Sequence, residues 1–272
     1  GLQQGWEVKY LGSLRGQEGR ACERAGVGFR GFPSEPLYRL SSAKGLKGAL
    51  NLARSSILVR RALLDLEPTV VFSTGGYASA PVVAAARKLR IPYIIHEQNT
   101  VPGRTNRILA RNSYAVATTF RRGGEHFPES RVVRTGMPLR KEFRNGGQGA
   151  FGFAQSLPSD APMVLVMGGS QGALALNDAA LATAVRMARV PVQWLHITGT
   201  AHFDGMTHSM RKLALHERYS LRAYLEGEEM AAAIFCCSLA VCRSGAGSLS
   251  ELAAFRKPSV LVPFPQAFAD HQ

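Results

Sequence analysis

The stretch that decides the fold is Pro92-Tyr93-Ile94-Ile95-His96-Glu97-Gln98-Asn99-Thr100-Val101-Pro102-Gly103-Arg104-Thr105-Asn106-Arg107. Its apolar, β-branched start, residues 91–95, predicts a buried strand, and four polar residues follow directly. Polar side chains cannot sit in a core without partners, so these four belong at the carboxyl end of the strand. In an open parallel α/β sheet this end is where ligands bind. We therefore expect His96 to Asn99 to line a crevice, and Pro102-Gly103 to turn the chain into a helix from about Thr105.

A structural interpretation of the four polar residues stands beside the functional one. In the structural interpretation, His96 and Asn99 satisfy backbone groups of the loop and cap the following helix. In the functional one, the four side chains line a ligand-binding crevice. Four polar side chains in succession weaken the structural interpretation.

A second strand and glycine loop open the latter half of the chain. Residues 163–167, Met-Val-Leu-Val-Met, form a continuous apolar run typical of a central parallel strand, and helical periodicity starts at Leu174. Between them lies Gly168-Gly169-Ser170-Gln171-Gly172-Ala173. Glycines let the backbone approach an oxygen closely and the helix dipole favours negative charge, so this loop predicts an anion site. It is neither a P-loop nor a dinucleotide fingerprint, which favours a diphosphate without a nicotinamide.

Two other turns are candidate ligand sites. Gly75 and Gly76 precede a helix at 82–89, and their backbone N–H groups could receive a phosphate, although a tight turn without a ligand is built in the same way. Ser248 and Glu251 fit the Ser-x-x-Glu capping box. Glu251 therefore either closes its helix or, at the mouth of a crevice, accepts hydrogen bonds from both hydroxyls of a ribose.

Repeated βα units on both sides of a glycine- and proline-rich stretch predict an α/β protein with two doubly wound domains facing a cleft. We assign residues 1–145 to the first domain, 146–161 to a linker and 162–272 to the second domain. The chain opens as if inside a helix and stops just past a strand at 259–263. We therefore expect both domains to be incomplete, the first without its opening strand and glycine loop, the second without its closing helices.

The composition favours a polyanionic partner. With 33 Lys and Arg against 19 Asp and Glu, the formal net charge is +14, which suits nucleic acid, anionic lipid headgroups or phosphate-bearing substrates. No basic module is interleaved with aromatic residues, so nucleic acid is not expected. The segment 37–66 carries lysines and arginines among leucines and is broken by Gly45 and Gly48. It either lies on anionic lipid or forms a solvated helix face over ordinary core.

The four cysteines lack metal-ligand spacing, and we expect neither a metal nor a cofactor. Free cysteines fit a reducing cytoplasm. No run approaches the roughly 18 apolar residues needed to span a bilayer, so any membrane contact is expected to be peripheral.

Several blocks together resemble the MurG family of bacterial glycosyltransferases, in glycosyltransferase family 28. The blocks lie in the family's order at 74–77, 96–106, 136–140, 168–173, 242–251 and 258–272. The resemblance implies a GT-B fold and an inverting transferase that moves N-acetylglucosamine from UDP-N-acetylglucosamine to lipid I, giving lipid II in peptidoglycan synthesis. The alternatives are another GT-B lipid glycosyltransferase, such as one acting on diacylglycerol, and an inactive nucleotide-sugar-binding fragment.

The resemblance also implies roles for individual residues. Asn99 would contact the donor sugar, Arg140 and Ser170 the diphosphate, and Glu251 the ribose. The other substrate contacts would come from Gln171, Leu225, Ala246, Gly247, Ser248, Leu249, Ser250 and Gln272, and the phosphate loops from Gly75, Gly76, Gly168, Gly169 and Gly172. His96 is the candidate base, with Glu97 in the same catalytic group, and a histidine in the family's first glycine loop is an equal rival for the base. The implied partners are UDP-N-acetylglucosamine, lipid I and the anionic surface of the bacterial inner membrane, at whose cytoplasmic face the protein would be peripheral.

Overall fold

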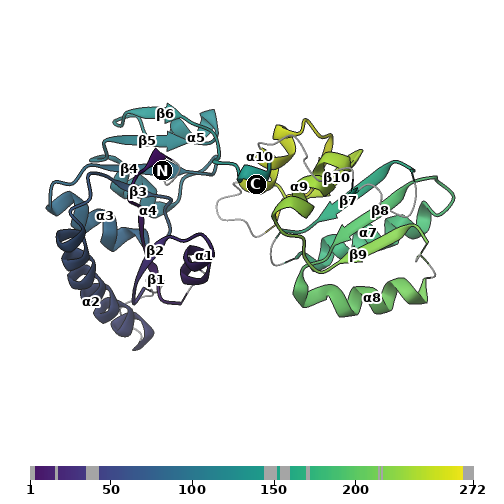
Figure 1. The fold of residues 1–272 in the computed structure, drawn as a ribbon, viewed down its shortest axis with the longest axis horizontal. Helices are drawn as coiled ribbons and strands as arrows, with labels where there is room; N and C mark the ends of the chain where they lie inside the picture. The colour runs from purple at the N-terminus through teal and green to yellow at the C-terminus, as the bar shows by residue number, and fades with distance from the viewer. Residues whose placement is uncertain are drawn as a thin grey trace. The chain divides into compact units, whose positions relative to one another are not determined.

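The chain forms two compact units, Gly1–Gly136 and Met137–Gln272, each built from parallel strands and helices (Figure 1). This computed structural model describes residues 4–15, 18–34, 43–143, 152–153, 160–169, 172–213, 215 and 217–265, with the side chains of 43–50 excepted. Every strand pair in the described residues is parallel. The α/β class predicted from the sequence is confirmed.

The first unit holds two parallel sheets, one of β1 and β2 and one ordered β3-β4-β5-β6. Its elements in chain order are β1 (Lys9–Ser13), α1 (Glu18–Arg24), β2 (Gly28–Phe32), α2 (Ala43–Leu66), β3 (Val71–Ser73), α3 (Ser79–Lys88), β4 (Tyr93–Glu97), α4 (Arg104–Ala110), β5 (Ala115–Thr118), α5 (Arg121–Gly124) and β6 (Val132–Arg134). Its core joins Ile95 and Val116 of the sheet to Leu63 of α2 and Val83 of α3. The carboxyl ends of β3 and β4 therefore rest on a packed base.

The second unit has one five-stranded sheet, ordered β11-β10-β7-β8-β9. Its elements are the 3-10 helix η2 (Lys141–Phe143), β7 (Met163–Met167), α7 (Leu174–Arg186), β8 (Gln193–Ile197), the 3-10 helix η3 (Thr200–His202), α8 (Phe203–Lys212), β9 (Tyr219–Arg222), α9 (Gly227–Cys236), β10 (Leu239–Cys242), α10 (Ala246–Ala254) and β11 (Ser259–Leu261). All five residues of β7 are buried.

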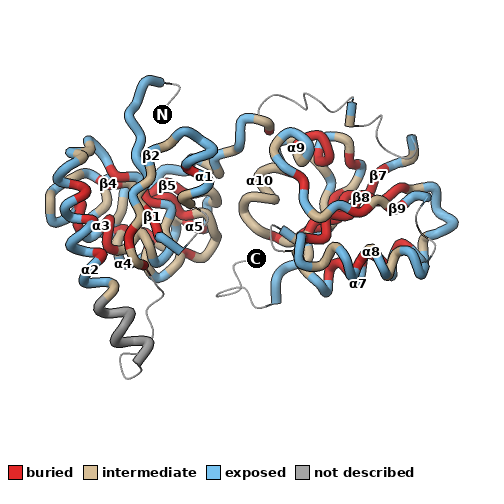
Figure 2. The backbone as a smooth tube through the Cα atoms, turned by 60° about the horizontal axis from the view of Figure 1, so that its bottom comes forward, coloured by how far each residue is buried: buried red, intermediate tan, exposed pale blue. Residues whose placement is uncertain are grey.

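The two faces of β7 belong to different cores, which explains its unbroken apolar sequence. Met163, Leu165 and Met167 pack with α9 and α10 on one face, and Val164 and Val166 pack with α7 and α8 on the other. Figure 2 shows the buried residues concentrated along β7 and β8. A strand covered on both faces needs apolar residues throughout and cannot alternate between apolar and polar ones. The unbroken apolar run therefore predicted a central parallel strand correctly.

The structure changes some predicted boundaries. The helix α2 runs without a break from Ala43 through Gly45 and Gly48, because packing of its later turns against the core outweighs the weak helix propensity of glycine. Residues 137–143, which the sequence placed in the first domain, belong to the second unit, where Phe143 is 3% exposed in the core. Most of the linker assigned to 146–161 lies outside the described residues.

All four cysteines are free thiols, and three of them are buried. Cys22 lies in the core of the first unit, and Cys237 and Cys242 lie in that of the second. Burial raises the pKa of Cys237 and that of Cys242 to about 11 in each case. Among the described residues, no helix combines the length and the apolar character needed to cross a bilayer.

Candidate functional site

The block at the end of β4 closes around one buried carboxylate. The strand runs two residues further than predicted, so Glu97 is its last residue and is 2% exposed. Its Oε1 accepts a hydrogen bond from the Asn99 N–H at 2.9 Å, and its Oε2 accepts from the Gly103 N–H at 3.2 Å and from Asn106 Nδ2 at 2.9 Å. Three donors hold both oxygens of Glu97. The structure therefore supports a positioning role for Glu97 in place of the catalytic role predicted from the sequence.

His96 is also enclosed, at 2% exposure. Its Nε2 lies 3.1 Å from the carbonyl oxygen of Gly136, and its ring stacks on Phe72 of the neighbouring strand with the centroids 6.1 Å apart. A carbonyl oxygen only accepts, so Nε2 of His96 is the donor in this contact. Because the ring is 2% exposed, it is shielded from an acceptor substrate in the conformation described.

A cavity of about 200 Å³ joins the glycine turn after β3 to the loop after β4. The two strands pair in parallel, with Ser73 beside Ile95, so both loops leave the same edge of the sheet. The cavity is lined by Thr74, Gly76, Glu97, Gln98, Asn99, Gly103, Arg104, Thr105 and Asn106. Apart from Glu97, whose oxygens are already hydrogen-bonded, this lining offers polar donors and one arginine, which suits an anionic ligand.

The glycine turn has to be glycine at position 75. Gly75 has a φ of +87°, and a Cβ added there would lie 2.9 Å from both the amide nitrogen and the amide oxygen of Asn106. Asn106 thus fills the space under the turn while donating to Glu97. No role was predicted for Asn106 from the sequence, because nothing in the local spacing indicates that its amide will donate to a glutamate nine residues earlier.

The predicted donor loops of the second unit meet at the switch point of its sheet. From β7 the chain adds β8 and β9 on one side, then returns to add β10 and β11 on the other. Met167 pairs with Cys242, so the loop that starts at Gly168 and the loop that starts at Arg243 leave neighbouring positions. Ligands of doubly wound folds bind where the strand order reverses in this way.

The loop after β7 packs tightly against the protein at one end. A Cβ on Gly168 would lie 2.6 Å from the backbone nitrogen of Ala173, and one on Gly172 would lie 2.2 Å from the Thr198 carbonyl oxygen. Gly169 and Gly172 both have positive φ, at +91° and +76°. The predicted ligand residues Ser170 and Gln171, and Gln272 at the end of the chain, lie outside the described residues.

The helix α10 overturns the capping-box interpretation of Glu251. Its N-cap is Gly245 in an extended conformation, without a side-chain capping bond, so Ser248 lies inside the helix. Glu251 Oε1 instead forms an ion pair with Arg140 Nη2 at 2.8 Å. The Arg140 guanidinium also lies 4.8 Å above the ring of Phe143. Two residues 111 positions apart, both predicted to contact the donor, are thus brought together.

The other predicted donor residues are placed as follows. The first turn of α10 holds Ala246, Gly247, Ser248 and Leu249, all partly buried, and Ser250 donates to the Ala246 carbonyl oxygen at 2.8 Å. Leu225 follows β9, and its side chain is 4% exposed in the core. Only the backbone of Leu225 is therefore suited to contact a base.

A buried polar chain in the second unit escaped the sequence analysis. Asn177 of α7, His196 of β8 and Tyr219 of β9 are joined by hydrogen bonds, with Nδ1 of His196 2.7 Å from the Tyr219 hydroxyl and Nε2 3.0 Å from Asn177 Oδ1. Burial lowers the pKa of His196 to about 4 and raises that of Tyr219. The available signal was a histidine beside the apolar residues Trp194, Leu195 and Ile197 of the strand Gln193–Ile197.

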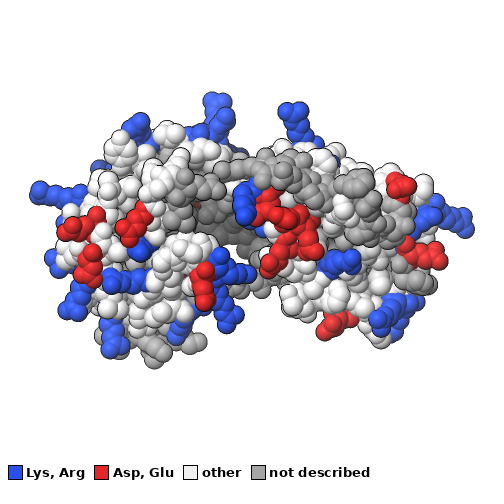
Figure 3. Space-filling view, in the orientation of Figure 1, with Lys and Arg blue, Asp and Glu red and all other residues white. Residues whose placement is uncertain are grey.

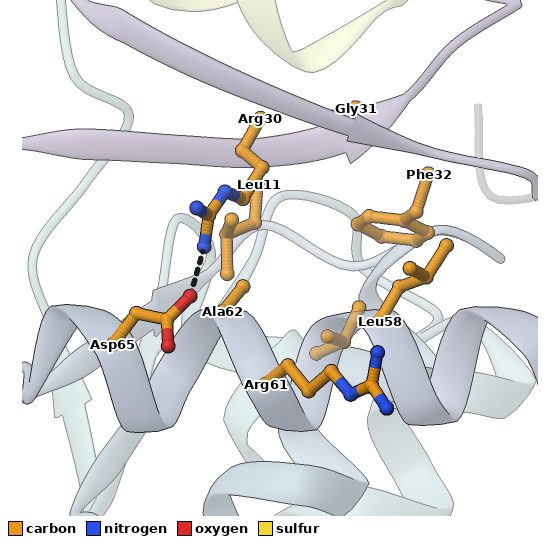
Figure 4. A pocket seen from close by; sticks show the side chains of 9 residues that line it. Leu11, Arg30, Gly31, Phe32, Leu58, Arg61, Ala62 and Asp65 are labelled. Carbon is orange, nitrogen blue, oxygen red and sulfur yellow. Dashed lines mark hydrogen bonds and ion pairs between the residues drawn. The ribbon is translucent and has the colours of Figure 1, made fainter.

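Other surface features are less specific. A second cavity, of about 290 Å³, lies between β2 and α2, with Leu11, Phe32 and Leu58 on its walls and the Arg30–Asp65 ion pair at 3.1 Å on its rim (Figure 4). Figure 3 shows Lys and Arg side chains spread over the face in view, not gathered in one band. Within the described residues there is no group of three or more His, Cys, Asp or Glu side chains suited to hold a metal ion.

Two α/β units, each with parallel strands and a glycine loop at the carboxyl end of a strand, fit the GT-B class of glycosyltransferase folds. Residues 2–118 match the glycosyltransferase family 28 N-terminal domain, and residues 163–272 match the glycosyltransferase family 28 C-terminal domain. The chain belongs to glycosyltransferase family 28.

Relatives of known name agree with this assignment. A protein of Exiguobacterium sp. is 35% identical over 98% of this chain and 73% of its own length, and one of Halalkalibacterium halodurans is 33% identical with the same coverage. Both are named UDP-N-acetylglucosamine--N-acetylmuramyl-(pentapeptide) pyrophosphoryl-undecaprenol N-acetylglucosamine transferase. The crystal structure of Acinetobacter baumannii MurG superposes with a TM-score of 0.72 at 28% identity, covering 100% of this chain and 73% of that one.

Proposed function

We propose that this chain transfers N-acetylglucosamine from UDP-N-acetylglucosamine to lipid I, the undecaprenyl-pyrophosphoryl N-acetylmuramyl peptide, to give lipid II. The observation that carries the proposal is the similarity, over 98% of the chain, to relatives named for this reaction. The geometry of each unit adds support, because each has a polar, glycine-rich loop at the carboxyl end of a parallel sheet.

The second unit would bind the UDP moiety. The backbone at Gly168 and Gly169, followed by the N-terminus of α7, offers N–H donors and the positive end of a helix dipole to a diphosphate, and Gly172 closes the turn between them. Arg140 adds a mobile positive charge, since its side chain is 45% exposed. Glu251 would accept hydrogen bonds from the ribose through Oε2, while Oε1 stays with Arg140. Ser170, Gln171 and Gln272 are proposed as further donor contacts on the family resemblance.

The first unit would bind the acceptor. The cavity between Gly76 and Arg104 suits the pyrophosphate of lipid I, because it combines backbone N–H groups, hydroxyls and one guanidinium. Asn99, whose N–H donates to Glu97, would present its side-chain amide to the donor sugar. No metal is required by this arrangement, since arginine and N–H donors can stabilise the diphosphate.

In the reaction, the acceptor 4-hydroxyl would attack the anomeric carbon of N-acetylglucosamine from the face opposite UDP. A C–O bond forms as the bond to UDP breaks, the configuration inverts, and a base takes the hydroxyl proton. We propose that His96 acts in this reaction by tying β4 to the backbone of Gly136. Its burial argues against the direct base role that its sequence position predicts.

The helix α2 is proposed to contact the membrane that carries lipid I. Its described part exposes Ile57 by 57% and Leu58 by 47%, beside the exposed residues Arg54, Arg60 and Arg61. A basic and apolar helix face of this kind suits peripheral binding to anionic lipid at the cytoplasmic face. Vesicle binding that needs anionic lipid and weakens with salt would support this placement.

The function is tested by incubating the purified chain with lipid I and radiolabelled UDP-N-acetylglucosamine and measuring labelled lipid II. Formation of lipid II is expected, with no transfer to diacylglycerol and no use of UDP-glucose. Glu251→Ala should weaken UDP binding by about 1.5–3 kcal/mol if it removes a charge-assisted ribose contact. Glu129→Ala is the matched control, because Glu129 forms an exposed ion pair with Arg111 in the first unit. Transfer to diacylglycerol, or equal affinity for UDP and ADP, would refute the proposal.

A further inference from the structure

The buried chain Tyr219–His196–Asn177 has a single consistent hydrogen-bond direction. Asn177 Nδ2 donates to the Thr198 carbonyl oxygen at 3.0 Å, so the amide oxygen of Asn177 faces His196. That oxygen only accepts, which makes Nε2 of His196 the protonated nitrogen and Nδ1 the acceptor for the Tyr219 hydroxyl. The direction therefore runs from the Tyr219 hydroxyl through the neutral imidazole and the amide to the Thr198 carbonyl.

The end of this chain touches the glycine loop after β7. The Thr198 carbonyl oxygen lies where a Cβ on Gly172 would be, at 2.2 Å, so this oxygen and the Gly172 backbone are in close contact. The Gly172 N–H in turn donates to the Gly169 carbonyl oxygen at 3.0 Å. A shift of Thr198 would therefore move Gly172 and disturb the turn that it closes with Gly169.

The members of this chain are too buried for any other use. His196 and Asn177 are 0% exposed and Tyr219 is 2% exposed, so none can contact a substrate. Buried polar groups lose their hydration, and they stabilise the fold only when every one of their hydrogen bonds is made. Apolar side chains at these positions would carry no such cost. Here each hydrogen bond is made in sequence, and the last one fixes a carbonyl beside the proposed diphosphate loop.

We propose that Asn177, His196 and Tyr219 are positioning residues that set the position of Gly172, and with it the start of α7, for the UDP diphosphate. The proposal rests on the proposed function for its ligand. The chain of hydrogen bonds fixes Thr198, Thr198 fixes Gly172, and Gly172 fixes the direction of the backbone N–H groups at the start of α7.

The test uses conservative and disruptive substitutions at His196. The side-chain amide of glutamine can place its nitrogen near the Nε2 position, so His196→Gln keeps a donor to Asn177, whereas His196→Leu removes it. We expect His196→Leu and Asn177→Ala to weaken UDP binding by about tenfold in titration calorimetry, and His196→Gln to stay within about threefold of the unchanged chain. Leu181→Ala, a core change on the same helix α7, is the control for loss of stability alone, and it should leave UDP affinity unchanged in the folded protein.

Hydrogen exchange of the Gly172 amide in the ligand-free chain gives a second readout that does not depend on UDP. Faster exchange in His196→Leu than in Leu181→Ala, restored in His196→Gln, is expected. Unchanged exchange, or equal loss of UDP affinity in Leu181→Ala, overturns the inference. If the unchanged chain does not bind UDP, the proposed function fails, and the positioning of a diphosphate loop fails with it. In that case the hydrogen-exchange experiment still decides whether the hydrogen bonds of Tyr219, His196 and Asn177 hold Gly172 in place.

Discussion

Gly172 offers a test of how closely the glycine loop is built against Thr198. Gly169 and Gly172 both have a φ in the left-handed region, so alanine at either site costs about 1–2 kcal/mol in backbone strain. At Gly169 none of the described residues lies within 4 Å of the new Cβ, so backbone strain is the cost expected there. At Gly172 the new Cβ would lie 2.2 Å from the Thr198 oxygen, against the roughly 3.3 Å of a normal carbon–oxygen contact.

The Thr198 carbonyl would have to retreat by about 1 Å, which breaks its hydrogen bond from Asn177. Leaving those buried groups unpaired adds about 1–3 kcal/mol. We therefore expect Gly172→Ala to lower the free energy of unfolding by about 2–5 kcal/mol and Gly169→Ala by about 1–2 kcal/mol. Urea unfolding followed by the fluorescence of Trp194, which is buried in β8, measures both values without ligand. Equal shifts of the urea midpoint in the two variants would refute the reasoning.

Three further predictions concern the polar groups of the site. Glu97→Gln should lower the free energy of unfolding by about 2–3 kcal/mol, because hydrogen bonds to a buried charge are lost. The control Glu129→Gln should lower it by less than about 1 kcal/mol, because its ion pair is exposed. Similar losses for the two variants in thermal unfolding would contradict this. Lowering the pH from 6.5 to about 4 should destabilise the chain by about 3 kcal/mol through His196. Its folded pKa is depressed, so only the unfolded state takes up a proton in that window, and no effect is expected above pH 6.5. His196→Gln should remove this pH dependence, and parallel stability curves for the two proteins would argue against it. A double-mutant cycle with Arg140→Ala and Glu251→Gln measures the coupling energy of this ion pair. It should be about 1 kcal/mol or less, because the Arg140 side chain is 45% exposed and water screens the pair. A coupling energy above about 3 kcal/mol would contradict this.

The sequence predicts the fold best where a strand is buried on both faces. The run 163–167 was predicted at its observed bounds, since continuous apolar residues followed by glycines allow little else. The glycine loops after β3 and β7 were also found, because close backbone approach and positive φ leave a mark in the residue type.

The sequence fails where polar atoms find partners far along the chain. His96 and Glu97 were expected outside the core, yet both end β4 inside it, because donors arrive from Gly103 and Asn106. The spacing of Ser248 and Glu251 satisfies a capping box, but the helix starts at Ala246, two residues before Ser248, and the Glu251 carboxylate pairs with Arg140 instead. Neither event is visible in local spacing.

The buried cysteines make each unit a separate reporter of its own opening. At pH 8, thiols with a pKa of about 11, such as those of Cys237 and Cys242, exist as thiolate in only about one molecule in a thousand, and folding also shields them from reagents. Cys22, 6% exposed, is shielded in the same way in the first unit. Brief alkylation followed by peptide mass spectrometry would therefore time the opening of the first unit at Cys22 and that of the second at Cys237 and Cys242. Ligand-induced protection could then be assigned to one unit without any added label.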